Sequence, residues 1–577
     1  MSAIVALASS MAAARVAPPR TCAVIGGGIA GLACARRLEE LGIRATVFDT
    51  GRTAPGGRAS SRSLRLPNGV LTFDHAAQFF TATGAFAELA RGWEADGTIR
   101  RWDHGLGELN ARTGAFVEYA RHGTAGGADR WIGARSMRDV SAALARGLDV
   151  RQGVWVSPDG GITRRADDGR YVVRAGGREL GAYDAIAVAH NGKCAERLSR
   201  GAGSEGVHRL LRARFAPALR AAQPADRLVL NSIFSLLAVL PRSQLAGSRL
   251  SADLGGARVH GSAELGFVVC HTRKRPESAA ALAPDEEAWS LFSTAAFGAA
   301  HKAPQEAMPP DVVADVTAKL LAAFGAAVGA RAPLAPTRTH LQLWGAAVPL
   351  NVWRADADTC GGAPAPARAC ALDGARRIGA CGDWLRAPSV QGAWESGVAL
   401  ADALADARAD AGGVPAGRWL PVAALASDPG AAGFFVDDTE PPARGAALVP
   451  ERRAARRDAN ARAPHGGARR APGGARAAAD APARAFVRGL PPGATEADLA
   501  ECVRGALGEA TGAAPRDAIV RASLLRRDDG PARCGIVLLR SAALLDALLG
   551  ARAPEIAGRR LHVERARSAA ARERRIS

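Results

Sequence analysis

The chain has 577 residues, 48% of them hydrophobic, so it is too long for one compact core and is expected to fold as several domains. Its formal net charge of +19 is carried almost entirely by arginine and is concentrated after residue 440. Nine single cysteines without a CxxC pair argue against a disulfide framework or a metal site, and no apolar run reaches the ~20 residues of a membrane span.

The first 20 residues are rich in alanine and serine and contain no acidic residue, since the first one is Glu39. This composition is typical of an organelle transit peptide. A disordered N-terminal extension and a secretory signal are the alternative interpretations.

Residues 22–50 have the pattern of a βαβ unit that binds a dinucleotide. An apolar strand ends in a glycine turn, a helix with apolar residues at helical spacing follows, and a second strand ends at Asp49. In G-x-G-x-x-G the first glycine permits the tight turn, the second admits a diphosphate, and the third lets helix and strand pack closely, while the acid accepts ribose hydroxyls. The predicted contacts in this unit are Gly26, Gly28, Ile29, Ala30, Gly31 and Asp49.

Two further glycine motifs follow at a distance. Gly56-Gly57-Arg58 combines flexible backbone with a fixed positive charge that suits a diphosphate. Gly382-Asp383 follows a short apolar strand, and Gly392 is expected to open a helix over 392–407. Each motif alone is also compatible with an ordinary surface turn.

The segments between the motifs are mixed. Strands are predicted at 154–157, 171–175 and 183–190, and residues 205–345 have a mixed, partly helical pattern in which 229–240 is a buried strand or helix. Residues 440–484 are almost entirely Ala, Arg, Gly and Pro, which predicts a disordered linker. Pattern returns at 485–567, where the predicted order is βαββαβ, with Thr495 capping the first helix.

The ordered set "VIGGGIAGLACA…VFD", "GGR", "LTFDHAAQFF", "FSTAAFG", "LQLWGAA" and "CGDW…GAWESG" resembles the flavin amine oxidase superfamily. Within it, residues 21 to about 410 look like the renalase-like FAD/NAD(P)-binding oxidoreductases of the plant and algal plastid branch. The resemblance implies non-covalent FAD, with Val154, Arg58, Asp383 and Gly392 as further cofactor contacts. It also implies a plastid location, with mitochondrion or cytoplasm as alternatives.

The implied reaction is hydride transfer from a small-molecule substrate, an amine or NAD(P)H-like compound, to flavin N5, followed by reoxidation by dioxygen or another acceptor. No catalytic triad is visible, and Gln78 and Trp344 are only weak pocket candidates. A non-catalytic flavin-binding or regulatory protein is the first alternative.

The C-terminal pattern resembles an RNA recognition motif in which "AFVRGL" takes the position of a base-stacking strand. Phe486 is the expected stacking residue, and Arg488 and Arg533 are expected to hold phosphate. Cys534 and Ile536 stand where two further aromatic residues belong, so RNA or another polyanion is an expected partner beside a protein-interaction role. An RNA-binding protein with a flavin redox sensor is the second alternative function.

The expected fold is therefore α/β, with a discontinuous Rossmann-type FAD-binding domain, an inserted α+β substrate domain and a ferredoxin-like, RRM-like βαββαβ domain. The predicted boundaries are 1–20 for the transit or disordered segment, 21–105, 150–204 and 371–412 for the FAD-binding domain, 106–149 for a substrate-side segment, 205–370 for mainly the substrate domain, 413–484 for the tail and linker, 485–567 for the RRM-like domain and 568–577 for a basic tail.

Overall fold

The computed structural model describes residues 18–120, 129–219, 226–356, 369–406, 414, 416–422, 483–491, 494–511, 518–525, 534–551, 554–557 and 559–565. The chain divides into one unit before and one unit after residue 447. Nearly all of the predicted transit segment, most of the predicted linker and the basic tail lie outside the described residues.

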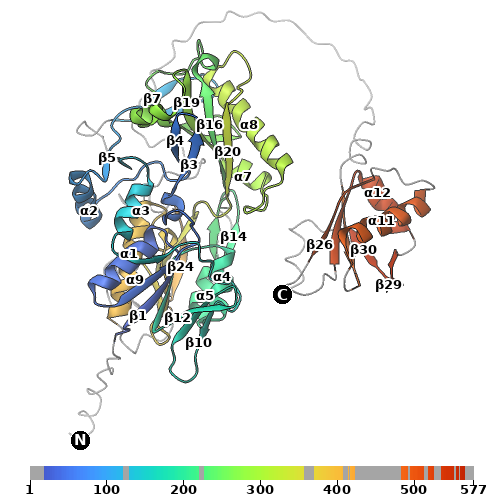
Figure 1. The fold of residues 1–577 in the computed structure, drawn as a ribbon, viewed down its shortest axis with the longest axis horizontal. Helices are drawn as coiled ribbons and strands as arrows, with labels where there is room; N and C mark the ends of the chain where they lie inside the picture. Colours follow the sequence, from blue (N-terminus) through green and yellow to red (C-terminus); the bar gives the residue numbers. More distant parts are fainter. Residues whose placement is uncertain are drawn as a thin grey trace, which may run out of the picture. The chain divides into compact units, whose positions relative to one another are not determined.

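The first unit is built on a six-stranded sheet in the order β22–β23–β13–β1–β2–β9. Figure 1 labels β1, one of its two central strands. Its strands are β1 (Thr21–Ile25), β2 (Arg44–Phe48), β9 (Asp149–Arg151), β13 (Ala185–Val188), β22 (Ala371–Asp373) and β23 (Ile378–Ala380). All neighbours are parallel except the edge strand β22. The central strands are buried on both faces, as parallel strands covered by two layers are. This confirms a Rossmann-like sheet assembled from distant parts of the chain.

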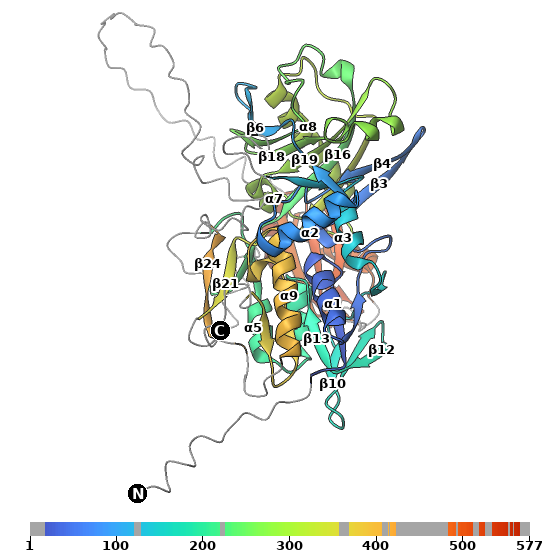
Figure 2. The same cartoon turned by 90° about the vertical axis from the view of Figure 1, so that its left-hand side faces the viewer.

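Helices cover one face of this sheet, and a small antiparallel sheet with two helices covers the other. The first layer contains α1 (Ile29–Glu40), α3 (Arg138–Ala145) and α9 (Val390–Ala405). The second contains β10 (Ile162–Arg164), β11 (Tyr171–Ala175), β12 (Arg178–Tyr183), α4 (Lys193–Arg200) and α5 (Glu205–Leu211). Helices α1 and α9 lie side by side (Figure 2), and a Cβ added at Gly397 would lie 2.1 Å from the carbonyl oxygen of Ala30.

Two sequence predictions in this part are corrected. Residues 154–157 form a loop after β9 rather than a strand, because the backbone N–H of Val154 donates to the carbonyl of Asp49 at 2.9 Å. Helix α9 begins at Val390 rather than at Gly392, because the Ser389 hydroxyl caps it by accepting from the Gly392 N–H at 2.9 Å.

The segments predicted to lie on the substrate side form a mixed seven-stranded sheet in the order β20–β16–β19–β18–β17–β6–β7, called the substrate-side sheet below. Its strands are β6 (Leu106–Asn110), β7 (Phe116–Glu118), β16 (Ile233–Pro241), β17 (Gly256–His260), β18 (Leu265–Cys270), β19 (Glu286–Ser293) and β20 (Arg338–Trp344). Helix α8 (Pro310–Val328) packs on one face. Residues 229–240 are mostly strand, in β15 (Leu228–Leu230) and β16, with a break at residues 231–232, and their continuous burial explains why the sequence shows no alternation.

Shorter elements complete the first unit: β3 (Ser61–Leu66), β4 (Gly69–Asp74), α2 (Gly84–Ala95), β5 (Ile99–Arg101), β8 (Trp131–Gly133), β14 (Ala213–Phe215), α6 (His271–Lys274), α7 (Ala295–Ala300), β21 (Asn351–Ala355) and β24 (Gly417–Pro421). Strands β3 and β4 form a hairpin that ends at Asp74. None of the helices in the described ranges combines the length and apolar character needed to span a bilayer.

The second unit contains a four-stranded antiparallel sheet in the order β26–β27–β25–β30. Its elements are β25 (Ala483–Arg488), α11 (Glu496–Thr511), β26 (Ile519–Leu525), β27 (Cys534–Leu539), α12 (Ala542–Gly550), β28 (Glu555–Ile556), β29 (Arg559–Arg560) and β30 (His562–Arg565). Both helices pack on one face of the sheet. Thr495 caps α11, since its hydroxyl accepts from the Asp498 N–H at 3.2 Å.

Candidate dinucleotide-binding site

The carboxyl ends of the parallel strands meet at one edge of the six-stranded sheet, and the first glycine turn lies at the centre of that edge. From β1 the chain continues to β2 on one side, whereas β13 lies on the other side. The turn after β1 is thus at the point where the strand order reverses, which is where open α/β sheets bind ligands. Gly26 has a φ of +115°, and a Cβ there would lie 3.1 Å from the carbonyl oxygen of Ala189.

The other two glycines of the turn differ in their surroundings. A Cβ at Gly28 would meet no atom within 4 Å, so the backbone before α1 faces open space. A Cβ at Gly31 would lie 1.9 Å from the carbonyl oxygen of Gly26, so here only glycine lets the helix approach the strand. The open N-terminus of α1, with Ile29 and Ala30 in its first turn, is a site where free N–H groups favour an anion.

Asp49 directly follows β2 at the same edge and is only 9% exposed. Its carboxylate accepts the N–H of Gly27 at 3.2 Å, which orients it beside the glycine turn. Burial raises the pKa of Asp49 above its ordinary value. Val154 is brought to this position by the bond from its N–H to the Asp49 carbonyl.

The second and third motifs are joined by an ion pair that the sequence did not predict. The Arg58 guanidinium donates to both carboxylate oxygens of Asp383, at 2.8 Å each, and to the carbonyl of Ala347 at 2.8 Å. Asp383 is 4% exposed, so the carboxylate of this bidentate pair is shielded from solvent. Burial opposes the charge on Arg58, but Asp383 keeps the Arg58 pKa above its ordinary value.

Backbone contacts fix this pair at the first glycine turn. Gly56 pairs with Gly28 in an isolated parallel bridge, and Gly56 and Gly57 both have positive φ, at +145° and +54°. The Gly382 N–H donates to the Ser396 hydroxyl in α9 at 2.9 Å. The three motifs therefore converge although more than 300 residues separate the first from the last.

These segments line a cavity of about 830 Å³, within the range of small-molecule and cofactor pockets. The predicted residues on its wall are Gly26, Gly28, Ile29, Ala30, Asp49, Gly56, Gly57, Arg58, Val154, Trp344, Gly382 and Asp383. Three predicted residues lie off the wall: Gly31, Gly392 and Gln78. Gly392 has a packing role, since a Cβ there would lie 2.2 Å from the carbonyl oxygen of Ala387.

Trp344 lies where β20 of the substrate-side sheet reaches the cavity. Its indole N–H donates to the carbonyl of His75 at 2.8 Å, and the two rings meet edge to face at 5.1 Å. This contact fixes the indole on the pocket wall.

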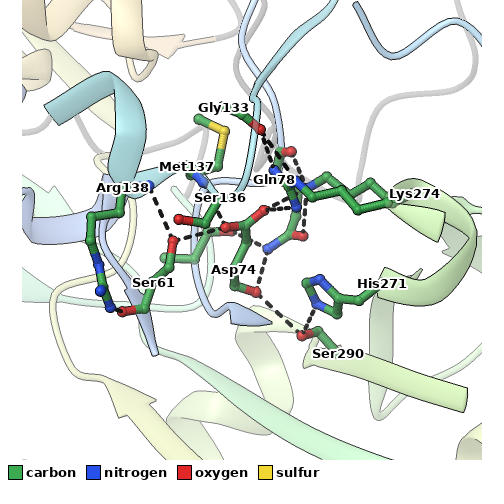
Figure 3. A network of polar contacts seen from close by, with 12 residues as sticks. Ser61, Asp74, Gln78, Gly133, Ser136, Met137, Arg138, His271, Lys274 and Ser290 are labelled. Carbon is green, nitrogen blue, oxygen red and sulfur yellow. Dashed lines mark hydrogen bonds and ion pairs between the residues drawn. The ribbon is translucent and has the colours of Figure 1, made fainter. Parts of the chain in front are cut away.

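Gln78, the other weak candidate, belongs to a buried polar network instead (Figure 3). At its centre is the Asp74 carboxylate, which accepts from the Lys274 ammonium at 2.9 Å and from the Arg275 guanidinium at 2.7 Å. The Ser61 hydroxyl and the Met137 N–H also donate to it, at 2.8 Å each. One carboxylate thus faces two buried cations.

Lys274 extends this network to the pocket wall. Its ammonium donates to the carbonyl and side-chain oxygens of Gln78, while residues 77 and 79–81 line the cavity. Burial lowers the pKa of Lys274 to about 7, against the opposing effect of Asp74. Arg275 and Lys274 hold the pKa of Asp74 far below its ordinary range although burial alone would raise it.

Sequence reasoning missed other wall residues. Trp155, His190 and Lys302 line the cavity. The Lys302 ammonium donates to the carbonyl of Gly345 at 3.3 Å and lies 3.5 Å from the Phe215 ring centroid. No sequence motif surrounds Lys302, so its position on the wall could not be predicted.

The Phe486 side chain in the second unit is half-buried, and the Arg488 guanidinium lies 5.3 Å from its ring centroid. Ala485 and Val487 are buried on the helix-covered face, so alternation puts Phe486 and Arg488 on the opposite face. Ile536 is paired with Phe486 on the neighbouring strand β27. Arg533 lies outside the described residues.

The six-stranded sheet and its glycine turn have the Rossmann-like arrangement that binds dinucleotides in other proteins. In agreement, residues 24–94 match the family described as NAD(P)-binding Rossmann-like domain. The chain is also 32% identical over 149 residues to the tRNA 5-methylaminomethyl-2-thiouridine biosynthesis bifunctional protein MnmC of Thiobacillus denitrificans. This match covers 25% of the chain and 24% of that protein, so the chain spans about a quarter of this relative's length.

Solved structures with a similar arrangement include cyclohexylamine oxidase from Brevibacterium oxydans IH-35A, with 14% identity and a TM-score of 0.43 over 67% of this chain and 99% of that one. UDP-galactopyranose mutase in its reduced form has 12% identity and a TM-score of 0.44 over 67% of this chain and 95% of that one. At these identities the likeness concerns the fold.

Proposed function

We propose that the chain is an FAD-dependent oxidoreductase that oxidises a small molecule, either an amine or a reduced nicotinamide. The observation that carries the proposal is the meeting of Arg58 and Asp383 beside the glycine turn, in a cavity that continues to Trp344 of the substrate-side sheet. A turn that bound only NAD would have no need of these two distant motifs.

The residues present fit a dinucleotide diphosphate. The first turn of α1 offers free N–H groups, the space at Gly28 is open, and Arg58 adds a fixed positive charge. The Asp49 carboxylate is suited to ribose hydroxyls and would repel a 2′-phosphate, so the site favours FAD over NADP as the resident group. Cys381 of the third motif is fully buried beside α9 rather than on the pocket wall, so it is not placed for covalent attachment of FAD.

A bound FAD supplies the hydride-accepting chemistry. The chain's own residues would bind and orient its diphosphate through Arg58 and the α1 N-terminus. Trp344, fixed by its bond to the His75 carbonyl, would form the wall against which a substrate lies and would exclude water.

The test is the absorbance spectrum of the purified full chain, followed by anaerobic titration with NADH, NADPH and a panel of primary amines. We expect a flavin spectrum that one of these compounds bleaches and dioxygen restores. A protein that stays colourless after incubation with FAD would refute the proposal. A bound flavin that no compound bleaches would favour the non-catalytic alternative.

For the second unit, we propose a ferredoxin-like, RRM-like domain that binds RNA or another polyanion through its open sheet face. The sheet order and the pairing of Phe486 with Arg488 support this proposal. Titration of the full chain with labelled single-stranded RNA at rising salt tests it, with Phe486→Ala as the variant. Unchanged affinity of Phe486→Ala would contradict base stacking and leave only a charge-driven interaction.

The plastid location also stays a proposal, supported by the composition of residues 1–20. A fluorescent fusion to this segment that fails to enter plastids would contradict it.

A further inference from the structure

Trp155 is an unusual residue of the pocket wall, because its side chain is 49% exposed although large aromatic side chains are mostly buried. It lies in the loop after β9, between the wall residues Val154 and Val156. An exposed indole at the edge of a cavity is a ready surface for a flat ring.

Two backbone bonds place this loop next to the acid of the glycine unit. The Val154 N–H donates to the Asp49 carbonyl, and the Gly153 N–H donates to the Gly51 carbonyl, at 2.9 Å each. Strand β9 is itself paired with β2, in which Phe48 faces Arg151. The loop that contains Trp155 therefore follows Asp49 along the carboxyl edge of the sheet.

The order of elements along that edge matches the order of groups in a dinucleotide. The α1 N-terminus after β1 suits the diphosphate, and Asp49 after β2 suits the ribose. The base attached to that ribose would then lie beside the loop that follows β9. The geometry points to the face of Trp155 as the stacking surface for the adenine ring of the bound dinucleotide.

This inference rests on one part of the proposed function, the binding of an adenine dinucleotide in the pocket, and does not depend on the flavin reaction. It assigns to Trp155 a role in the affinity for the base, in which the indole replaces water on one face of the ring. Base stacking on an aromatic side chain contributes enough that its removal should weaken binding by roughly fivefold to 150-fold.

The experiment uses the full chain freed of bound nucleotide and titrated with ADP and, separately, with FMN, which has no adenosine. We expect Trp155→Ala to weaken ADP binding within that range and to leave FMN binding unchanged. Trp155→Phe should retain most of the ADP affinity, because it keeps a flat ring. Val117→Ala, a truncation of another exposed apolar side chain on β7, serves as the matched control and should match the wild type.

Wild-type ADP affinity in Trp155→Ala would overturn the inference, and so would an equal loss for ADP and FMN, which would indicate a general disturbance of the pocket. The failure of the proposed function has a different signature. A chain that binds ADP through Trp155 but never takes up flavin would refute the FAD proposal and leave the stacking role intact.

Discussion

The buried network around Asp74 permits a quantitative prediction for Asp74→Asn. Asp74, Lys274 and Arg275 are at most 2% exposed, and one carboxylate compensates two cations. The substitution keeps the size of the side chain but leaves the guanidinium without a counter-charge. Removing one partner of a buried ion pair costs about 3–5 kcal/mol, so we expect the free energy of unfolding of the first unit to fall by that amount.

Lys274→Met is the matched comparison, because it leaves Asp74 and Arg275 as a balanced pair. We expect the free energy of unfolding of this variant to fall by less than about 2 kcal/mol, mainly because the hydrogen bonds to Gln78 are lost. All ten tryptophans precede residue 448, so tryptophan fluorescence during urea unfolding reports on the first unit.

The pH dependence gives a second readout. Burial lowers the pKa of Lys274 to about 7, so above that pH the unfolded chain holds a proton that the folded chain has released. Stability of the wild type therefore rises as the pH increases from about 7 toward the ordinary lysine range. Without Asp74 the Lys274 pKa should fall below 7, so just below pH 7 only the variant gains stability as the pH rises. The difference in free energy of unfolding between the wild type and Asp74→Asn should therefore narrow by up to ~1.4 kcal/mol per pH unit in that range. Equal losses in the two variants, or a deficit that grows with pH, would refute the reasoning.

Three further predictions concern the pocket and the helices. Arg58→Ala should weaken FAD binding roughly tenfold to 150-fold in a fluorescence titration. Arg58→Lys should restore only part of the FAD affinity, since an ammonium lacks the guanidinium fork that contacts both oxygens of Asp383. Full affinity in Arg58→Lys would contradict a role for that fork. Gly31→Ala should lower the free energy of unfolding of the first unit by about 1–3 kcal/mol in a urea titration, because its Cβ would lie 1.9 Å from the Gly26 carbonyl oxygen. Gly505→Ala in α11, where a Cβ would meet no atom within 4 Å, should stabilise the second unit by about 0.5–1 kcal/mol, as measured by amide exchange. A comparable loss of stability in both variants would contradict the steric explanation. Because burial raises the pKa of Asp49, acidification should lower the FAD affinity at a higher pH than for an ordinary aspartate. Asp49→Asn should abolish this pH dependence. A variant with the same pH profile as the wild type would show that the carboxylate takes no part in binding.

The glycine unit could be predicted because its requirements are local. Gly26 needs a positive φ and Gly31 needs the absence of a Cβ, and both are properties of the residue type at a fixed distance from a strand. The position of Asp49 at the end of β2 follows from the same short segment. Sequence alone therefore identified the sheet edge at which the cavity lies.

The residues that sequence reasoning misplaced depend on distant partners. "VWVS" has strong β propensity, but Val154 gives its N–H to Asp49, 105 residues earlier, and the segment becomes a loop. Gln78 seemed to belong to the pocket, yet it is oriented by Lys274, 196 residues later. Periodicity and motif spacing contain no information about which remote segment supplies such a partner.

The contact between α1 and α9 also has a consequence for how the protein is made. The small residues Ala30 and Cys34 of α1 face Leu400 and Ala401, which a ribosome adds only after some 360 further residues. Until then the part of α1 that packs on α9 has no cover, and Arg58 lacks the Asp383 carboxylate. The nascent chain thus exposes an aggregation-prone surface for most of its synthesis, and the dinucleotide site can be completed only after translation has passed α9.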